Sequence, residues 1–226
     1  RPVLAVEGAD RAGALVGERD DTRDIVAVQV DRLRRKHGFE RRKLALLNGS
    51  HSLLAYAATI LGHQTVDEAI ADPRCLAWVE QWWDEACAHL PLPADELAAY
   101  RQALLARYRN PNIRHALAQI ASDGSLKLPV RIVPTLRAEL AAGRTPAGAD
   151  RAVAAWVWHL RGLGAPVKDV NSAQVLPLVG GSLSEAVTAV LAYLGLAGED
   201  GLADLVLGLA EELAATGTVE LVRQGH

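Results

Sequence analysis

The sequence predicts an all-α domain preceded by a short extended lead-in. Half of the 226 residues are hydrophobic, and beyond residue 41 the apolar positions follow the period of helices that bury one face. Glycine and proline interrupt that pattern at intervals suited to helices. Only VLAV at residues 3–6 is typical of a strand. The length supports one substantial hydrophobic core.

The expected helices are the apolar periodic stretches between these breaks. In chain order they cover residues 25–37, 43–61, 66–71, 75–89, 95–108, 111–122, a helix opened by Pro129, 146–160, 186–196 and 201–215. Three glycines stand where left-handed C-terminal caps are common, at Gly38, Gly62 and Gly162. Thr65 can cap the helix that follows it.

Other boundaries carry more specific signals. Asp72-Pro73 separates two helices, and Ser182 with Glu185 matches a capping box. In DGSLKLPVR at residues 123–131 the first three residues predict a turn in which Gly124 takes a positive φ, with Pro129 opening the next helix. Trp82 and Trp83 point about 100° apart on a helix, so we expect one in the core and the other at the edge of a cleft or at an interface.

The stretch KLALLNGSHSLLAY at residues 43–56 places three polar side chains in an apolar helix. At ~100° per residue, Asn48 lies about 140° and His51 about 80° round the helix from Lys43, so all three share one broad side. The apolar positions on the opposite side are Leu44, Leu46, Leu53 and Ala57. This pattern is typical of a helix that packs on a core while it presents polar groups to a cleft.

Such a trio suits proton transfer at an alcohol or carbonyl carbon. Burial among leucines favours the neutral amine that Lys43 would need as a general base. The Asn48 amide can donate a hydrogen bond to a developing oxyanion, and His51 can hold a hydroxyl in place. The spacing alone also fits a snorkelling lysine, a kink at Asn-Gly and a surface histidine.

Composition excludes several other classes of function. The net charge of -3 and the pI near 6.2 argue against a nucleic-acid surface, which needs a clustered basic excess. The basic runs at residues 32–36 and 41–43 are explained by a solvated helix face. No apolar stretch has the length of a membrane span and no secretory signal opens the chain, so we expect a soluble, cytoplasmic protein.

The remaining reactive side chains give no further site. Cys75 and Cys87 lack the paired spacing of a metal or redox motif and are expected to be buried thiols, and no metal site is predicted. His159, on an apolar helix face, is expected in the core or at its edge. Methionine is absent, including from position 1, which is compatible with a domain cut from a longer protein, with a missing front segment or with replaced methionines.

The string RKLALLNGSHSLLAY resembles the signature of the mannitol dehydrogenase family, the polyol-specific long-chain dehydrogenases/reductases, in the C-terminal substrate domain. The family pattern of Lys, four residues, Asn, two residues, His falls on Lys43, Asn48 and His51. Two further stretches are also similar to the family in order and spacing. They are GHQTVDEAIADP at residues 62–73 and the stretch that begins with RYRNPNIRHALAQIASDGSLKLPVR at residues 107–131. The resemblance covers roughly residues 41–215.

This resemblance implies an architecture and a reaction. The fold would be the multi-helical type of the 6-phosphogluconate dehydrogenase C-terminal domain, with residues 1–40 as the connection to an N-terminal Rossmann domain and residues 41–226 as the helical substrate domain. NAD would be bound mainly by that Rossmann domain, because the only candidate glycine pair, Gly162 and Gly164, follows a helix rather than a strand. Lys43 would be the general base, Asn48 half of an oxyanion-stabilising pair, and His51 a positioner of the hydroxyl.

The resemblance also implies a polyol substrate. Lys127 and Arg131 would contact it, and the reaction would interconvert a sugar alcohol and a ketose. Mannitol with fructose is the leading pair, followed by arabinitol or a uronate. A hexuronate would require an extra cation in the cleft, which Lys127 or Arg131 could supply.

Two hypotheses from other classes remain beside the dehydrogenase. A free-standing helical module could bind a polyhydroxylated ligand or a partner without redox turnover. A helical DNA-binding regulator is the third, and the charge balance argues against it.

Overall fold

A computed structural model describes residue 29 and residues 36–216. The described residues are helices and connecting loops, with no strand and a single isolated antiparallel bridge between Thr65 and Ala116. The predicted all-α class is confirmed. The predicted strand at residues 3–6 and most of the predicted helix at residues 25–37 lie outside the described residues.

The chain divides into units 1–40 and 41–226, and the helices discussed below belong to the second unit. Its elements are η1 (Lys43–Gly49, a π-helix), α2 (Ser50–Ile60), α3 (Val66–Ala71), α4 (Pro73–Cys87), α5 (Ala94–Tyr108), α6 (Leu117–Ile120), α7 (Gly124–Arg131), α8 (Val133–Ala141), α9 (Ala147–Leu160), α10 (Ser172–Val175), η2 (Leu176–Val179, a 3₁₀ helix), α11 (Leu183–Tyr193) and α12 (Leu202–Thr216).

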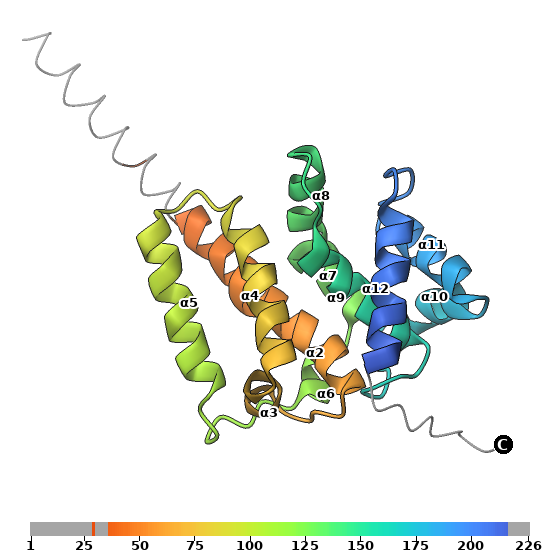
Figure 1. Ribbon diagram of the computed structural model, residues 1–226, viewed down its shortest axis with the longest axis horizontal. Helices are drawn as coiled ribbons and strands as arrows, with labels where there is room; N and C mark the ends of the chain where they lie inside the picture. The colour runs from red at the N-terminus through yellow and green to blue at the C-terminus, as the bar shows by residue number, and fades with distance from the viewer. Residues whose placement is uncertain (1–28, 30–35, 217–226) are drawn as a thin grey trace, which may run out of the picture. The chain divides into compact units, whose positions relative to one another are not determined.

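Two helices, α2 and α9, form the centre of this unit. They pack against each other, and α4, α8, α11 and α12 pack around α9 (Figure 1). Nearly every residue of α9 is buried, and α2 is buried from Ser52 to Ala58. Such all-round burial is typical of a helix enclosed by others rather than of an amphipathic surface helix.

The predicted boundary signals are largely confirmed. Thr65 and Ser182 each form a capping box, with Glu68 and Glu185 respectively. Gly62 and Gly162 have φ values of 92° and 86°, which the absence of a Cβ permits.

Several predicted elements were wrong in detail. Residues 43–61 are not one α-helix, because the first seven residues are π-helical. Residues 111–122 contain turns and only the short helix α6. Residues 36–40 are all helical, so Gly38 does not end a helix.

The loop before α7 also differs from the prediction. Asp123, not Gly124, takes the left-handed conformation, with φ 54°. Gly124 is required for space, since a Cβ there would lie 2.3 Å from Nε1 of Trp156. Pro129 lies inside α7 and does not begin the next helix.

Burial corrects two further expectations. Trp82 and Trp83 are both fully buried, so neither lines a cleft edge. Leu44 is 38% exposed, whereas Leu46, Leu53 and Ala57 are buried as expected. Among the described residues, no helix is long and apolar enough to cross a membrane.

Candidate active site

The candidate site is built on η1, a π-helix that passes directly into α2. Two tryptophans from α4 bind its backbone: Nε1 of Trp82 donates to the Ala45 carbonyl and Nε1 of Trp83 to the Leu46 carbonyl, each at 2.9 Å. Gly49 permits this packing, since a Cβ there would lie 2.5 Å from the Trp82 ring. π-Helical segments are rare and occur frequently at functional sites.

The π-helix changes the relative positions of the candidate residues. Its hydrogen bonds run from residue i to residue i+5, so Asn48 lies about one turn beyond Lys43, closer to the side of Lys43 than α-helical spacing predicts. His51 follows in the first turn of α2. The structure therefore carries all three side chains on one continuous segment, with Lys43 exposed and Asn48 and His51 half-buried.

The exposure of Lys43 contradicts the expectation that leucines bury it. Neither exposed Leu44 nor half-buried Leu47 encloses the lysine, and the neighbour that is fully buried, Leu46, belongs to the core. The described residues therefore do not supply the apolar surroundings that were expected to favour a neutral amine.

His51 lies among groups that keep it neutral. Its ring stacks on that of Tyr108, with 5.0 Å between centroids, and meets His115 edge-on at 5.9 Å. Burial lowers the pKa of His51 to about 4, with smaller contributions from the charges of His115, Arg107 and Arg131. Its Nε2 is buried and has no hydrogen-bond partner in the described part of the chain. A neutral imidazole with an unused nitrogen can bind a substrate hydroxyl.

Sequence reasoning missed the residues around His51. The Tyr108 hydroxyl lies 2.8 Å from Ser50 Oγ and donates to the Leu47 carbonyl at 3.2 Å, which fixes the junction of η1 and α2. The signal that could have found them is the stretch RYRNPNIRH, which contains both Tyr108 and His115. This stretch is part of the resemblance to the family, but no role was predicted for either residue.

Lys127 is tied to its own loop. Its Nζ donates to the Ile120 carbonyl at 3.1 Å, to the Ser122 carbonyl, and to Ser122 Oγ at 3.3 Å. These partners match the three donors of an ammonium group. Burial lowers the pKa of Lys127, and the charge of Arg131 lowers it further. To bind a substrate, Lys127 would have to replace some of these hydrogen bonds with bonds to the substrate.

Arg131, at the end of α7, is half-buried and points toward α2. Its Nη1 donates to Ser52 Oγ at 3.2 Å, beside His51. Burial lowers the pKa of Arg131, because the charged guanidinium has lost part of its solvation. Of the two predicted substrate-contacting cations, this one lies against the turn that carries His51.

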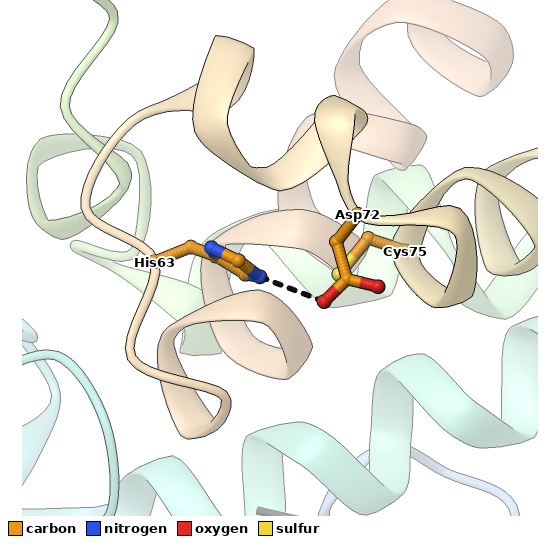
Figure 2. A group of neighbouring side chains, drawn as sticks. All are labelled: His63, Asp72 and Cys75. Carbon is orange, nitrogen blue, oxygen red and sulfur yellow. Dashed lines mark hydrogen bonds and ion pairs between the residues drawn. The ribbon is translucent and has the colours of Figure 1, made fainter.

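A separate cluster joins His63, Asp72 and Cys75 (Figure 2). His63 Nε2 lies 3.0 Å from Asp72 Oδ2, and potential ligand atoms of the three residues all lie within 4.8 Å of one another. Asp72 is, however, the N-cap of α4, and it binds the backbone and the guanidinium of Arg74.

The electrostatics of this cluster favour a capping role. Hydrogen bonds from Arg74 hold the pKa of the Asp72 carboxyl well below its usual range. Burial raises the pKa of the Cys75 thiol to about 12, whereas metal ligation requires the thiolate. The hydrogen bonds of the helix cap explain why His63 and Asp72 lie together. Cys75 is a buried thiol, as the sequence predicted.

Comparison with known proteins identifies the family. Residues 37–200 match the model of the mannitol dehydrogenase C-terminal domain. Altronate oxidoreductases from Klebsiella pneumoniae (strain 342) and Escherichia coli O9:H4 (strain HS) are each 40% identical over 126 residues, which are 55% of this chain and 26% of the relative. The chain thus matches about a quarter of the length of these relatives.

Two solved structures are similar in fold. Pseudomonas fluorescens mannitol 2-dehydrogenase, in a ternary complex with NAD and D-mannitol, superposes with a TM-score of 0.67 and 29% identity over 79% of this chain and 38% of its own. A substrate-free D-sorbitol dehydrogenase has a TM-score of 0.69 at 20% identity, with 77% and 38% coverage, which supports the fold alone. The predicted resemblance is confirmed: the chain belongs to the mannitol dehydrogenase family and carries its C-terminal domain.

Proposed function

We propose that this chain is the substrate domain of an NAD-dependent polyol dehydrogenase in which Lys43 is the general base. The observation that carries the proposal is the placement of Lys43, Asn48 and His51 on the continuous segment of η1 and α2. The family match and the likeness to a mannitol 2-dehydrogenase support the reaction class. Among uncharged substrates, we propose that the enzyme interconverts mannitol and fructose.

Each of the three residues would have a different role in the oxidation of one carbinol carbon. Lys43 takes the hydroxyl proton as the hydride leaves, and the Asn48 amide donates to the oxygen on which negative charge develops. His51, held neutral by burial, hydrogen-bonds the hydroxyl and keeps it in place. NAD, when bound, accepts the hydride.

The proposal includes a partner domain for this chain. Residues 1–40 would connect residues 41–226 to an N-terminal Rossmann domain in a cytoplasmic enzyme. Three large hydrophobic side chains on η1 and α7 are exposed, namely Leu44 at 38%, Leu126 at 54% and Val130 at 55%. They neighbour Lys43, Lys127 and Arg131 in sequence, as expected if another domain covers this face beside the site.

A second substrate class is favoured by a specific observation. The altronate oxidoreductases, at 40% identity, are named for a sugar acid rather than an uncharged polyol. A sugar acid carries a carboxylate that needs a cationic partner. Both classes undergo the same oxidation of a secondary alcohol, so the roles proposed for Lys43, Asn48 and His51 are common to them.

The decisive experiment replaces the base in the complete enzyme. Lys43→Ala should lower turnover by roughly 10² to 10⁴, the usual contribution of general acid–base catalysis, without lowering the melting temperature, because Lys43 is exposed. Small amines added to the alanine variant should restore part of the rate. Lys168→Ala, at another exposed lysine, is the matched control and should turn over normally.

Wild-type turnover by the Lys43→Ala variant at every pH would refute the assignment. A complete protein that oxidises neither polyols nor sugar acids would instead favour the alternative of a helical module that binds a ligand or a partner without redox chemistry.

A further inference from the structure

The first turn of α7 is bound by a carboxylate from a distant part of the chain. Asp169 lies in the loop between α9 and α10, 44 residues beyond Ser125. Its Oδ2 accepts from the Ser125 backbone N–H at 2.9 Å, and its Oδ1 accepts from the Ser125 hydroxyl. In the described chain, the N-cap residue of α7, Asp123, has a left-handed backbone and its side chain caps none of the helix N–H groups. Asp169 therefore supplies the cap that the local sequence does not.

Further hydrogen bonds join the same two loops. The Val170 N–H donates to the Asp123 carboxylate at 3.1 Å. Asn171 donates from its side-chain amide to the Ser125 hydroxyl at 3.1 Å, and from its backbone N–H to Asp169 Oδ1 at 2.9 Å. Each oxygen of Asp169 thus accepts from a backbone N–H, one at Ser125 and one at Asn171. An amide group has a single acceptor oxygen, so asparagine at this position would leave one of the two N–H groups facing another donor.

The helix that Asp169 caps carries both cations proposed to contact the substrate, Lys127 and Arg131. α7 packs against η1 and α2, which carry the proposed general base and its two polar partners. Arg131 holds the end of the helix through Ser52 Oγ, whereas Asp169 holds its start. Burial and the charge of Arg131 lower the pKa of Lys127. The negative charge of Asp169 opposes that shift, so it also acts on Lys127 through space.

We propose that Asp169 is a positioning residue for the substrate site, which fixes the start of α7 and thereby places Lys127 and Arg131 beside η1. This inference rests on the proposed dehydrogenase function and adds to it a residue from a separate loop. The groups proposed for proton transfer lie on η1 and α2 rather than on α7. Loosening α7 should therefore weaken substrate binding more than it slows the chemical step.

The test measures KM and kcat of the complete enzyme at saturating NAD, with mannitol and with altronate as substrates. Asp169→Asn keeps the shape of the side chain but loses one acceptor and the charge. KM should rise about tenfold, the equivalent of one hydrogen bond to a charged group, and kcat should fall by a smaller factor. A purely structural role would reduce the amount of folded enzyme and leave KM unchanged.

Ser125→Ala gives a graded second variant. It removes the hydroxyl that donates to Asp169 but keeps the bond from the Ser125 backbone N–H. KM should rise about twofold to tenfold, as expected for one hydrogen bond of a neutral donor, and by less than in Asp169→Asn.

Ser182→Ala is the matched control. Ser182 caps α11 through its side chain, which accepts from the Glu185 N–H at 3.2 Å, and α11 carries none of the proposed site residues. Loss of this cap should lower the free energy of unfolding, measured by urea denaturation. It should leave KM unchanged.

The outcomes separate this inference from the function on which it rests. A normal KM in Asp169→Asn, or an equal rise of KM in Ser182→Ala, would overturn the positioning role while the dehydrogenase proposal stands. If Asp169→Asn does not fold, Ser125→Ala decides the question, and a normal KM in that variant would overturn the role. A wild-type enzyme that oxidises neither mannitol nor altronate would overturn the proposed function and this inference with it.

Discussion

Trp82 occupies the space that any side chain on Gly49 would need, since a Cβ at Gly49 would lie 2.5 Å from the Trp82 ring. The same tryptophan donates its N–H to the Ala45 carbonyl of the π-helix. Trp82 therefore both limits how closely α4 approaches η1 and satisfies one backbone carbonyl of η1. We expect the orientation of Lys43 and Asn48 to depend on this packing.

We expect Gly49→Ala to destabilise the fold and to slow turnover together. Forcing a methyl group into a packed core costs about 1 to 3 kcal/mol, and the shift of η1 would displace Asn48 from its position beyond Lys43. Urea denaturation and kcat of the complete enzyme measure the two effects. Gly208→Ala is the matched control, because Gly208 lies in α12 and a Cβ there would meet nothing within 4 Å; it should stabilise slightly, as helical Gly→Ala changes do.

An unchanged denaturation midpoint for Gly49→Ala would mean that Trp82 can move aside. The tryptophan would then not be what imposes the π-helical geometry.

A second prediction concerns Asp150, in the first turn of α9. It is fully buried, both carboxyl oxygens lack a hydrogen-bond partner among the described residues, and burial together with the charge of Glu85 raises its pKa to about 8. The pKa in the folded state exceeds the ordinary value, so the folded protein holds this proton over a pH range in which the unfolded chain has lost it. The resulting decrease in the free energy of unfolding is absent below about pH 4 and grows until about pH 8.

Asp150→Asn should therefore be increasingly stabilising relative to the wild type as pH rises from 4 to 8. Each pH unit in that window contributes up to about 1.4 kcal/mol per group. Urea unfolding at several pH values measures the difference. A stability difference that is flat across this range would show that Asp150 is ionised and compensated in the folded protein.

His51 provides a third prediction. Because burial lowers its pKa to about 4, its imidazole should stay neutral from about pH 6 to about pH 9. Nitrogen-15 NMR of the assigned His51 ring would follow its protonation directly. A midpoint close to the ordinary value of about 6.5 would show that the ring is solvated, and a change in activity in that range could then be caused by His51 rather than by Lys43.

The sequence by itself determined the features that depend on local chemistry. The N-cap at Thr65, the capping box at Ser182 and the glycine stops at Gly62 and Gly162 act within a few residues, so helix borders could be predicted from them. The spacing of Lys43, Asn48 and His51 likewise lies within one segment. It predicted both the family and the candidate site.

Only the tertiary structure decided the features that depend on distant partners. The π-helix is stabilised by indole donors 37 residues away along the chain, whereas local spacing predicted an α-helix there. The sequence predicted both Lys127 and Arg131 as substrate-contacting cations. They became different because the carbonyls of Ile120 and Ser122 surround one ammonium, while folding places the other charge beside Ser52, with no carboxylate among the described residues to compensate it.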